Sequence, residues 1–203
     1  MRNERPRRAA AAAFAAACLT GHLATAFEID PVDAARLHDG QIIVQSVVGR
    51  ERQNRGWVNA AVWIDAEPEA VWSVMTDCPS APLFVPGMKR CTVLEQAADR
   101  SWEVIEHEVK PSAFLPRMHY VFRASYRRPE RIDFRQVRGD FERNEGTWEL
   151  TRPGGYGGTI VKYSVVIEPR FYAPRWLVRV SLEKNLPELM RALRERVGAT
   201  TGG

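Results

Sequence analysis

The stretch from Lys89 to Glu168 constrains the fold more than any other part of the chain. It is a series of short segments rich in β-branched and aromatic residues, separated by turn signals such as Arg128-Pro129-Glu130 and the run from Pro153 to Gly158. These connections are too short for the crossover that parallel neighbours need, so the strands are predicted to be antiparallel. The predicted strands cover residues 90–96, 102–109, 118–126, 131–137, 145–150 and 159–167.

The residues before this stretch add a hairpin and two small helices. Residues 41–48 and 57–64 are predicted to form a β-hairpin, because both are rich in β-branched and aromatic residues and the segment between them is charged. Pro68 is predicted to open a helix, since proline is favoured at the first helical position. A short helical turn is predicted over residues 81–85.

A long amphipathic helix is predicted to close the chain over residues 174–197, and residues 198–203 are expected to form a flexible tail. Pro187 is expected either to kink this helix or to remove one of its hydrogen bonds near Glu183. Together with the antiparallel strands, the helices give an α+β fold class. The apolar stripe of the closing helix consists of Leu182, Leu186, Leu189, Leu193 and Val197.

Alternation within residues 118–126 separates the two faces of the predicted sheet. The apolar face is predicted to point inward. Because one helix cannot cover a bent sheet of this size, a cavity or a dense aromatic core has to fill the remaining space. The inward set is Met118, Tyr120, Phe122, Ala124 and Tyr126, and the outward set is His119, Arg123, Ser125 and Arg127.

Composition indicates a single folded domain. The chain has 203 residues, of which 45% are hydrophobic and 27% charged, values within the globular range. Its net charge of +4 comes mostly from the first 26 residues, and the rest of the chain carries +1. The charge therefore gives no support to nucleic-acid binding.

The first 26 residues are typical of a cleaved secretory signal peptide. An Arg-rich start leads into an uncharged run over residues 9–19, and Ala24-Thr25-Ala26 supplies small residues before the cleavage site. The run is too short for a membrane-spanning helix. Export to the periplasm is therefore predicted. Arg7-Arg8 leaves a twin-arginine signal open, and Cys18 leaves a lipoprotein cleavage site open.

Export affects how the cysteines are interpreted. Cleavage would leave Cys78 and Cys91, and an oxidising compartment favours a disulfide between them, with two buried reduced thiols as the alternative. The remaining histidines, His38, His107 and His119, are widely spaced and no Cys/His cluster accompanies them. No metal site is predicted.

Two motifs near the middle of the chain provide a family resemblance. Residues 66–77 read Ala-Glu-Pro-Glu-Ala-Val-Trp-Ser-Val-Met-Thr-Asp, and residues 84–88 read Phe-Val-Pro-Gly-Met. This pattern resembles the opening of START-like (SRPBCC) proteins, and most closely an exported form of the coenzyme Q-binding and polyketide cyclase/dehydrase branch. Gly146-Thr147-Trp148 and Glu168-Pro169 are weaker similarities. The resemblance implies a helix-grip fold, in which a curved antiparallel sheet wraps around the C-terminal helix and encloses a hydrophobic tunnel.

The resemblance also sets the expected domain organisation. It covers residues 57–197, which are predicted to form the START-like domain. Residues 27–56 are predicted to be an N-terminal extension with a hairpin strand.

The inward aromatic residues and the resemblance together predict a cavity that binds one hydrophobic molecule such as a lipid, a quinone or a polyketide. The first hypothesis is a carrier, sensor or chaperone-like protein without a cofactor and without an assigned catalytic residue. The second is an enzyme of the polyketide cyclase/dehydratase type. The predicted ligand-binding residues are Phe84, Tyr120, Phe122, Phe134, Trp148, Tyr163, Leu182, Leu186 and Leu189.

Several polar residues can be interpreted in two ways. His107 fits either a cavity acid or base, or a hydrogen-bonded strand residue. Glu106 and Glu108 share the other face and are interpreted as solvated rather than as paired catalytic carboxylates. The tyrosines suit both ligand orientation and core packing, and these are Tyr120, Tyr126 and Tyr163.

Two surface features bear on membrane contact. Phe114 and Leu115 lie between prolines in a loop, and they are interpreted either as a lid over the cavity mouth or as a transient contact with a membrane surface. Four arginines are interpreted as a solvated face, with contact to anionic head groups as the alternative. They are Arg123, Arg127, Arg131 and Arg135.

Overall fold

The computed structural model describes residues 27–48, 55–110, 113, 115–155, 157–170 and 175–201. The predicted signal peptide, Phe114 and the last two residues of the predicted tail lie outside these ranges. Within them, no helix is both long enough and apolar enough to cross a membrane.

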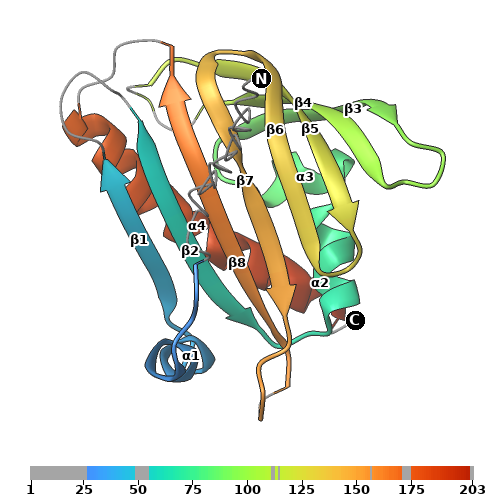
Figure 1. Ribbon diagram of the computed structural model, residues 1–203, viewed down its shortest axis with the longest axis vertical. Coiled ribbons are helices and arrows are strands. Elements are labelled where there is room, and N and C mark those ends of the chain that lie inside the picture. Colours follow the sequence, from blue (N-terminus) through green and yellow to red (C-terminus); the bar gives the residue numbers. More distant parts are fainter. Residues whose placement is uncertain are drawn as a thin grey trace, which may run out of the picture.

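A single antiparallel sheet of eight strands forms the body of the protein, with helix α4 across one face (Figure 1). The predicted α+β class and the antiparallel arrangement are confirmed. The strand order is β1-β2-β8-β7-β6-β5-β4-β3. The strands are β1 (Ile42–Val48), β2 (Gly56–Ile64), β3 (Met88–Gln96), β4 (Trp102–Val109), β5 (Met118–Arg127), β6 (Arg131–Gly139), β7 (Phe141–Thr151) and β8 (Thr159–Pro169).

The chain crosses from β2 to the opposite edge of the sheet through α2 (Pro68–Met75), η1 (Cys78–Ser80) and α3 (Ala81–Phe84). Proline begins α2, as the sequence predicts. Val71 and Trp72 on this helix are 0% and 4% exposed and belong to the main core. The crossover therefore covers part of the sheet that α4 does not reach.

A disulfide between Cys78 and Cys91 ties η1 to β3. The two Cα atoms are 5.4 Å apart, within the range of roughly 4.4–6.8 Å that disulfides need. The pairing predicted from the cysteine count is present, and it holds the end of the crossover against the edge strand.

Helix α4 (Arg175–Thr201) lies mainly against β1, β2 and α2. Met190, Leu193 and Val197 are buried in the main core. The helix continues through Pro187 and past its expected end at Val197 to Thr201. Residues 198–201 are therefore not a tail, and the Thr201 hydroxyl donates back to the Val197 carbonyl within the last turn.

The N-terminal extension covers the outer face of the sheet beside β1. Helix α1 (Pro31–His38) is capped by Asp30, whose carboxylate accepts from the Asp33 backbone N–H at 2.8 Å. Leu37 is fully buried and belongs to a cluster with Ala61 and Ile160, which point away from α4. Residues 27–38 therefore belong to the same folded unit as the strands.

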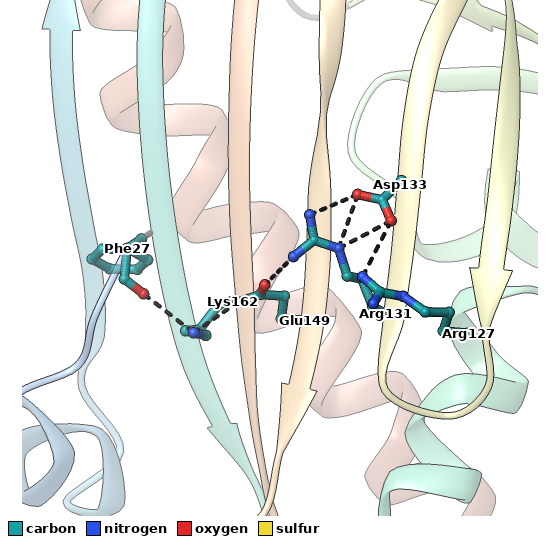
Figure 2. A network of polar contacts seen from close by, with 6 residues as sticks. All are labelled: Phe27, Arg127, Arg131, Asp133, Glu149 and Lys162. Atoms are coloured by element: carbon teal, nitrogen blue, oxygen red, sulfur yellow. Dashed lines mark hydrogen bonds and ion pairs between the residues drawn. The ribbon is translucent and has the colours of Figure 1, made fainter. Parts of the chain in front are cut away.

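A ladder of charged side chains crosses the outer face from β5 to β8 (Figure 2). Arg131 binds Asp133 through Nε at 2.9 Å and also binds Glu149, and Glu149 accepts from Lys162 Nζ at 2.7 Å. Lys162 in turn donates to the Phe27 carbonyl at 3.2 Å. Each exposed pair stabilises little on its own, but the ladder fixes the start of the described chain onto the sheet.

The other arginines of the predicted solvated face also have partners. Arg127 lies 3.6 Å from Asp133, Arg135 lies 3.0 Å from Glu145, and the Arg123 guanidinium packs over the Trp102 ring at 3.9 Å. This face carries paired charges rather than a free basic stripe.

Removal of the disulfide is predicted to destabilise the protein. In the chain-entropy model, closing a loop of 13 residues stabilises the fold by about 3 kcal/mol. We expect the double variant Cys78→Ala/Cys91→Ala to lose about this free energy of unfolding in urea titrations. A reductant should destabilise the wild type by a similar amount and leave the variant unchanged. Equal stability of the wild type and the variant would contradict the prediction.

Candidate functional site: an aromatic cavity under the sheet

A cavity of about 220 Å³ lies between the inner face of the sheet and the helices. The sheet side is formed by inward residues of β3 to β8. The opposite side is formed by Met75, Ala81 and Phe84 from the crossover and by Leu189 and Leu193 from α4. Cys78 and Cys91 also line it, so the disulfide is part of the cavity wall.

Strict alternation along the strands places the lining side chains. Tyr120, Phe122, Ala124 and Tyr126 of β5 all line the cavity, while Arg123 between them is exposed. The inward face predicted from this alternation is therefore the inner face of the sheet.

Aromatic rings form a continuous arc across the inner face. The ring of Phe122 lies 6.0 Å from Tyr120 and 6.1 Å from Phe134, and Phe134 lies 6.1 Å from Tyr163. Tyr163 stacks on Trp148 at 4.1 Å. Ring pairs at these separations interact favourably beyond their burial, so the arc forms a rigid wall.

Gly146 makes room for this arc. A Cβ atom at this position would lie 3.0 Å from the Phe134 ring and 2.1 Å from the Ser164 carbonyl oxygen. The absence of a side chain therefore lets Phe134 lie flat against β7, next to Tyr163.

The predicted ligand-binding residues largely meet in this cavity. Leu186 does not line it, because its side chain is 7% exposed and packs with Val58 and Val165 in a separate cluster. Leu182 lies in a part of α4 outside the described side chains. Seven of the nine line the cavity, namely Phe84, Tyr120, Phe122, Phe134, Trp148, Tyr163 and Leu189. Their role in binding stays a prediction.

The described residues of the loop before β5 do not line the cavity. Leu115 is 9% exposed and faces the protein, but it is not among the lining residues. Phe114 lies outside the described residues. A lid or membrane-contact role of these two residues stays a prediction.

His107 points into the cavity and is hydrogen-bonded. Its Nδ1 lies 3.2 Å from the Tyr120 hydroxyl, and the edge of the His107 ring meets the Phe122 ring at 4.8 Å. Burial lowers the pKa of His107 to about 4, because a desolvated imidazolium is unfavourable. His107 is therefore neutral at pH 7. Glu106 and Glu108 on the opposite face bind Arg90, which agrees with their solvated interpretation.

The tyrosines of the cavity are also neutral. Burial raises the pKa of Tyr120 and of Tyr163, and it raises that of Tyr126 together with a hydrogen bond to Glu103. The Tyr126 hydroxyl donates to Glu103 Oε2 at 2.8 Å. At neutral pH these hydroxyls act only as uncharged hydrogen-bonding groups.

Asn144 was not among the sequence-predicted site residues, although it lines the cavity with only 7% exposure. Its position, two residues before Gly146 and four before Trp148, places it on the same face of β7. His107, which the sequence analysis interpreted either as a cavity acid or base or as a strand residue, lies with Ile105 on the cavity face of β4. No described group of three or more His, Cys, Asp or Glu residues could hold a metal ion.

Solved structures with a similar fold come from several bacteria. A START superfamily protein from Mycobacterium smegmatis is 20% identical, with a TM-score of 0.62 over 71% of this chain and 98% of that chain. A STAR-related lipid transfer protein from Xanthomonas axonopodis is 18% identical, with a TM-score of 0.64 over 77% and 93%. An aromatase/cyclase from Streptomyces sp. R1128 is 14% identical, with a TM-score of 0.61 over 78% and 96%. These similarities show that the fold is the START-like helix-grip fold.

Sequence comparison identifies the family. No curated protein has a matching sequence. The family model of polyketide cyclase/dehydrase and lipid transport proteins matches residues 64–194, well over half of the chain. The START-like motifs, the fold and this match agree, and the chain belongs to the polyketide cyclase/dehydrase and lipid transport family.

Proposed function

We propose that this protein is a carrier or sensor that binds one hydrophobic small molecule in the cavity under the sheet. The observation that carries the proposal is the aromatic arc, which lines a cavity of about 220 Å³ between the sheet and the helices. A well-packed interior has few voids much larger than a water molecule, so an apolar space of this size suits a ligand. Membership of a family that includes lipid transport proteins supports this function.

The size of the cavity limits what it encloses. Pockets for drug-sized ligands are usually about 300–1,000 Å³, larger than the 220 Å³ found here. A small ring system or one end of a longer molecule therefore fits best. Each buried methylene would contribute roughly 0.8 kcal/mol, so apolar contacts alone give useful affinity.

A cyclase or dehydratase is the second candidate, and the His107–Tyr120 pair is the observation that favours it. The pair places a neutral imidazole and a hydroxyl against the cavity, where proton transfer to a ligand would be geometrically feasible. General bases work best with a pKa near the operating pH, however, and burial holds the pKa of His107 near 4. This favours the carrier.

We also propose export, and contact with a membrane surface during ligand transfer. The disulfide supports an oxidising compartment, because such bonds persist mainly outside the cytosol. Leu83 is 79% exposed on α3, next to the lining residues Ala81 and Phe84. An exposed leucine at this place would suit a brief insertion among lipid head groups.

Filling the cavity is predicted to abolish ligand binding. Ala124 is 1% exposed and lines the cavity, so a phenyl ring in Ala124→Phe would occupy the space of the ligand. We expect the affinity for an apolar fluorescent probe to fall at least about tenfold, because a well-packed site does not expand without strain. Fluorescence titration of the purified proteins measures this effect.

The matched control is Ser125→Phe, which places the same ring on the exposed face of the same strand. It should bind the probe as the wild type does. Circular dichroism establishes that both variants are folded. Unchanged probe binding by a folded Ala124→Phe protein would contradict a ligand site in this cavity.

The buried neutral state of His107 is predicted to make stability depend on pH. Its pKa is about 4 in the folded protein and about 6.5 in an unfolded chain. Between these values the unfolded chain binds a proton that the folded protein does not, so stability falls as pH decreases from about 6.5 toward 4.

His107→Phe removes this effect. From pH 7 to pH 4.5 we expect the wild type to lose about 2–3 kcal/mol more unfolding free energy than the variant. Urea titrations at both pH values measure the difference. Identical losses in the two proteins would show that His107 does not titrate as a buried neutral group.

A further inference from the structure

Asn144 is a buried polar residue without a protein partner. It lines the cavity with 7% exposure, and its side chain makes no hydrogen bond to any other described residue. Its amide has two N–H donors and one acceptor oxygen. Among the described residues, the only side-chain N or O atom that is both fully buried and without a partner is Gln136 Oε1, so the Asn144 amide keeps surface that a molecule in the cavity can reach. A ligand in the cavity would supply the missing partner.

The His107–Tyr120 pair leaves one further donor unused. A neutral imidazole has one N–H and a tyrosine has one O–H, while a single hydrogen bond joins the two residues. Whichever group donates in that bond, the other N–H or O–H stays available. Neither side chain has a second hydrogen bond to a described residue.

The strand register brings these groups to one end of the cavity. His107 is opposite Tyr120, and Tyr120 is opposite Gly139 at the end of β6. Asn144 follows shortly after the turn at Asp140 that joins β6 to β7. All three side chains point to the inner face of the sheet and line the same cavity.

Charge is absent from this lining. Among the described residues that line the cavity there is no Asp, Glu, Lys or Arg. Glu103, which accepts from the Tyr126 hydroxyl, is not part of the lining. A carboxylate or phosphate group placed inside would lose its hydration and meet no opposite charge. The available groups include three N–H or O–H donors, two on Asn144 and one on the His107–Tyr120 pair, which suits a ligand oxygen that accepts.

We propose that the cavity selects an uncharged ligand with a carbonyl oxygen, which accepts hydrogen bonds from Asn144 and from the His107–Tyr120 pair. This inference rests on the proposed binding function and adds the chemical class of the ligand. The apolar remainder of the ligand lies along the aromatic arc.

The test compares three competitors of equal carbon number at pH 7: a medium-chain methyl ketone, the corresponding carboxylate and the parent alkane. Each competitor is titrated into the full-length protein bound to an apolar fluorescent probe, and displacement of the probe is measured. We expect the ketone to bind at least about tenfold more tightly than the carboxylate, because only the carboxylate loses a hydrated charge on entry.

Asn144→Leu tests the polar contact itself. The ketone should bind about 5- to 20-fold more weakly to this variant, the size of effect that follows loss of one buried hydrogen bond. Binding of the alkane should not weaken. The thermal unfolding midpoint should not fall, because the Asn144 side chain has no hydrogen bond to a described residue to lose. Asn59→Leu, the same substitution on the outer face of β2, should leave both competitors unaffected.

The outcomes separate the two proposals. If no competitor and no probe binds, the binding function itself fails. If the probe binds but the ketone and the carboxylate compete equally, only the selectivity proposal fails. A lower unfolding midpoint in Asn144→Leu, or its failure to fold, would show that Asn144 has a structural role and would overturn its assignment to the ligand. The double variant His107→Phe/Tyr120→Phe removes the available donor of the pair, whichever residue carries it, and should weaken ketone binding without affecting the alkane.

Discussion

The limited reach of one helix across eight strands determines the organisation of this protein. Eight strands at a spacing of about 4.8 Å span roughly 34 Å, whereas a helix with its side chains is about 10–12 Å across. Helix α4 lies mainly against β1 and β2, and the inner face of the remaining strands needs other cover. The crossover supplies part of it and is held in place by the disulfide to β3. The space between is the cavity.

The aromatic side chains explain why this space does not close. Flexible aliphatic residues could rearrange to fill a gap, but rings that stack or pack edge to face across the sheet hold one another in position. Phe134 contacts Phe122 on one side and Tyr163 on the other. Moving one ring inward would break contacts with its neighbours, so the inner face of the sheet keeps its shape.

The periodicity of the sequence predicted most of this architecture, because strand alternation is a local property. It identified the eight strands, the inward face of β5 and most of the aromatic wall. It did not predict the direction of the Leu186 side chain, because this depends on how α4 is rotated against β2. It also did not predict that Leu37 packs on the outer face, because this depends on where the N-terminal segment meets the sheet. The helix was predicted to end at Val197, before Gly198, but it continues to Thr201.

Asn144 illustrates a second reason why sequence reasoning missed part of the site. The strand was predicted to begin at residue 145, so Asn144 fell outside it, whereas β7 begins at Phe141 and places Asn144 on the cavity face. His107, which burial holds neutral, lowers stability once the pH falls below its unfolded pKa of about 6.5. The disulfide beside the cavity and the charged ladder on the opposite face of the sheet stabilise the fold. The polar end of the cavity therefore lowers stability at acidic pH, a cost expected if its residues serve the proposed ligand rather than the fold.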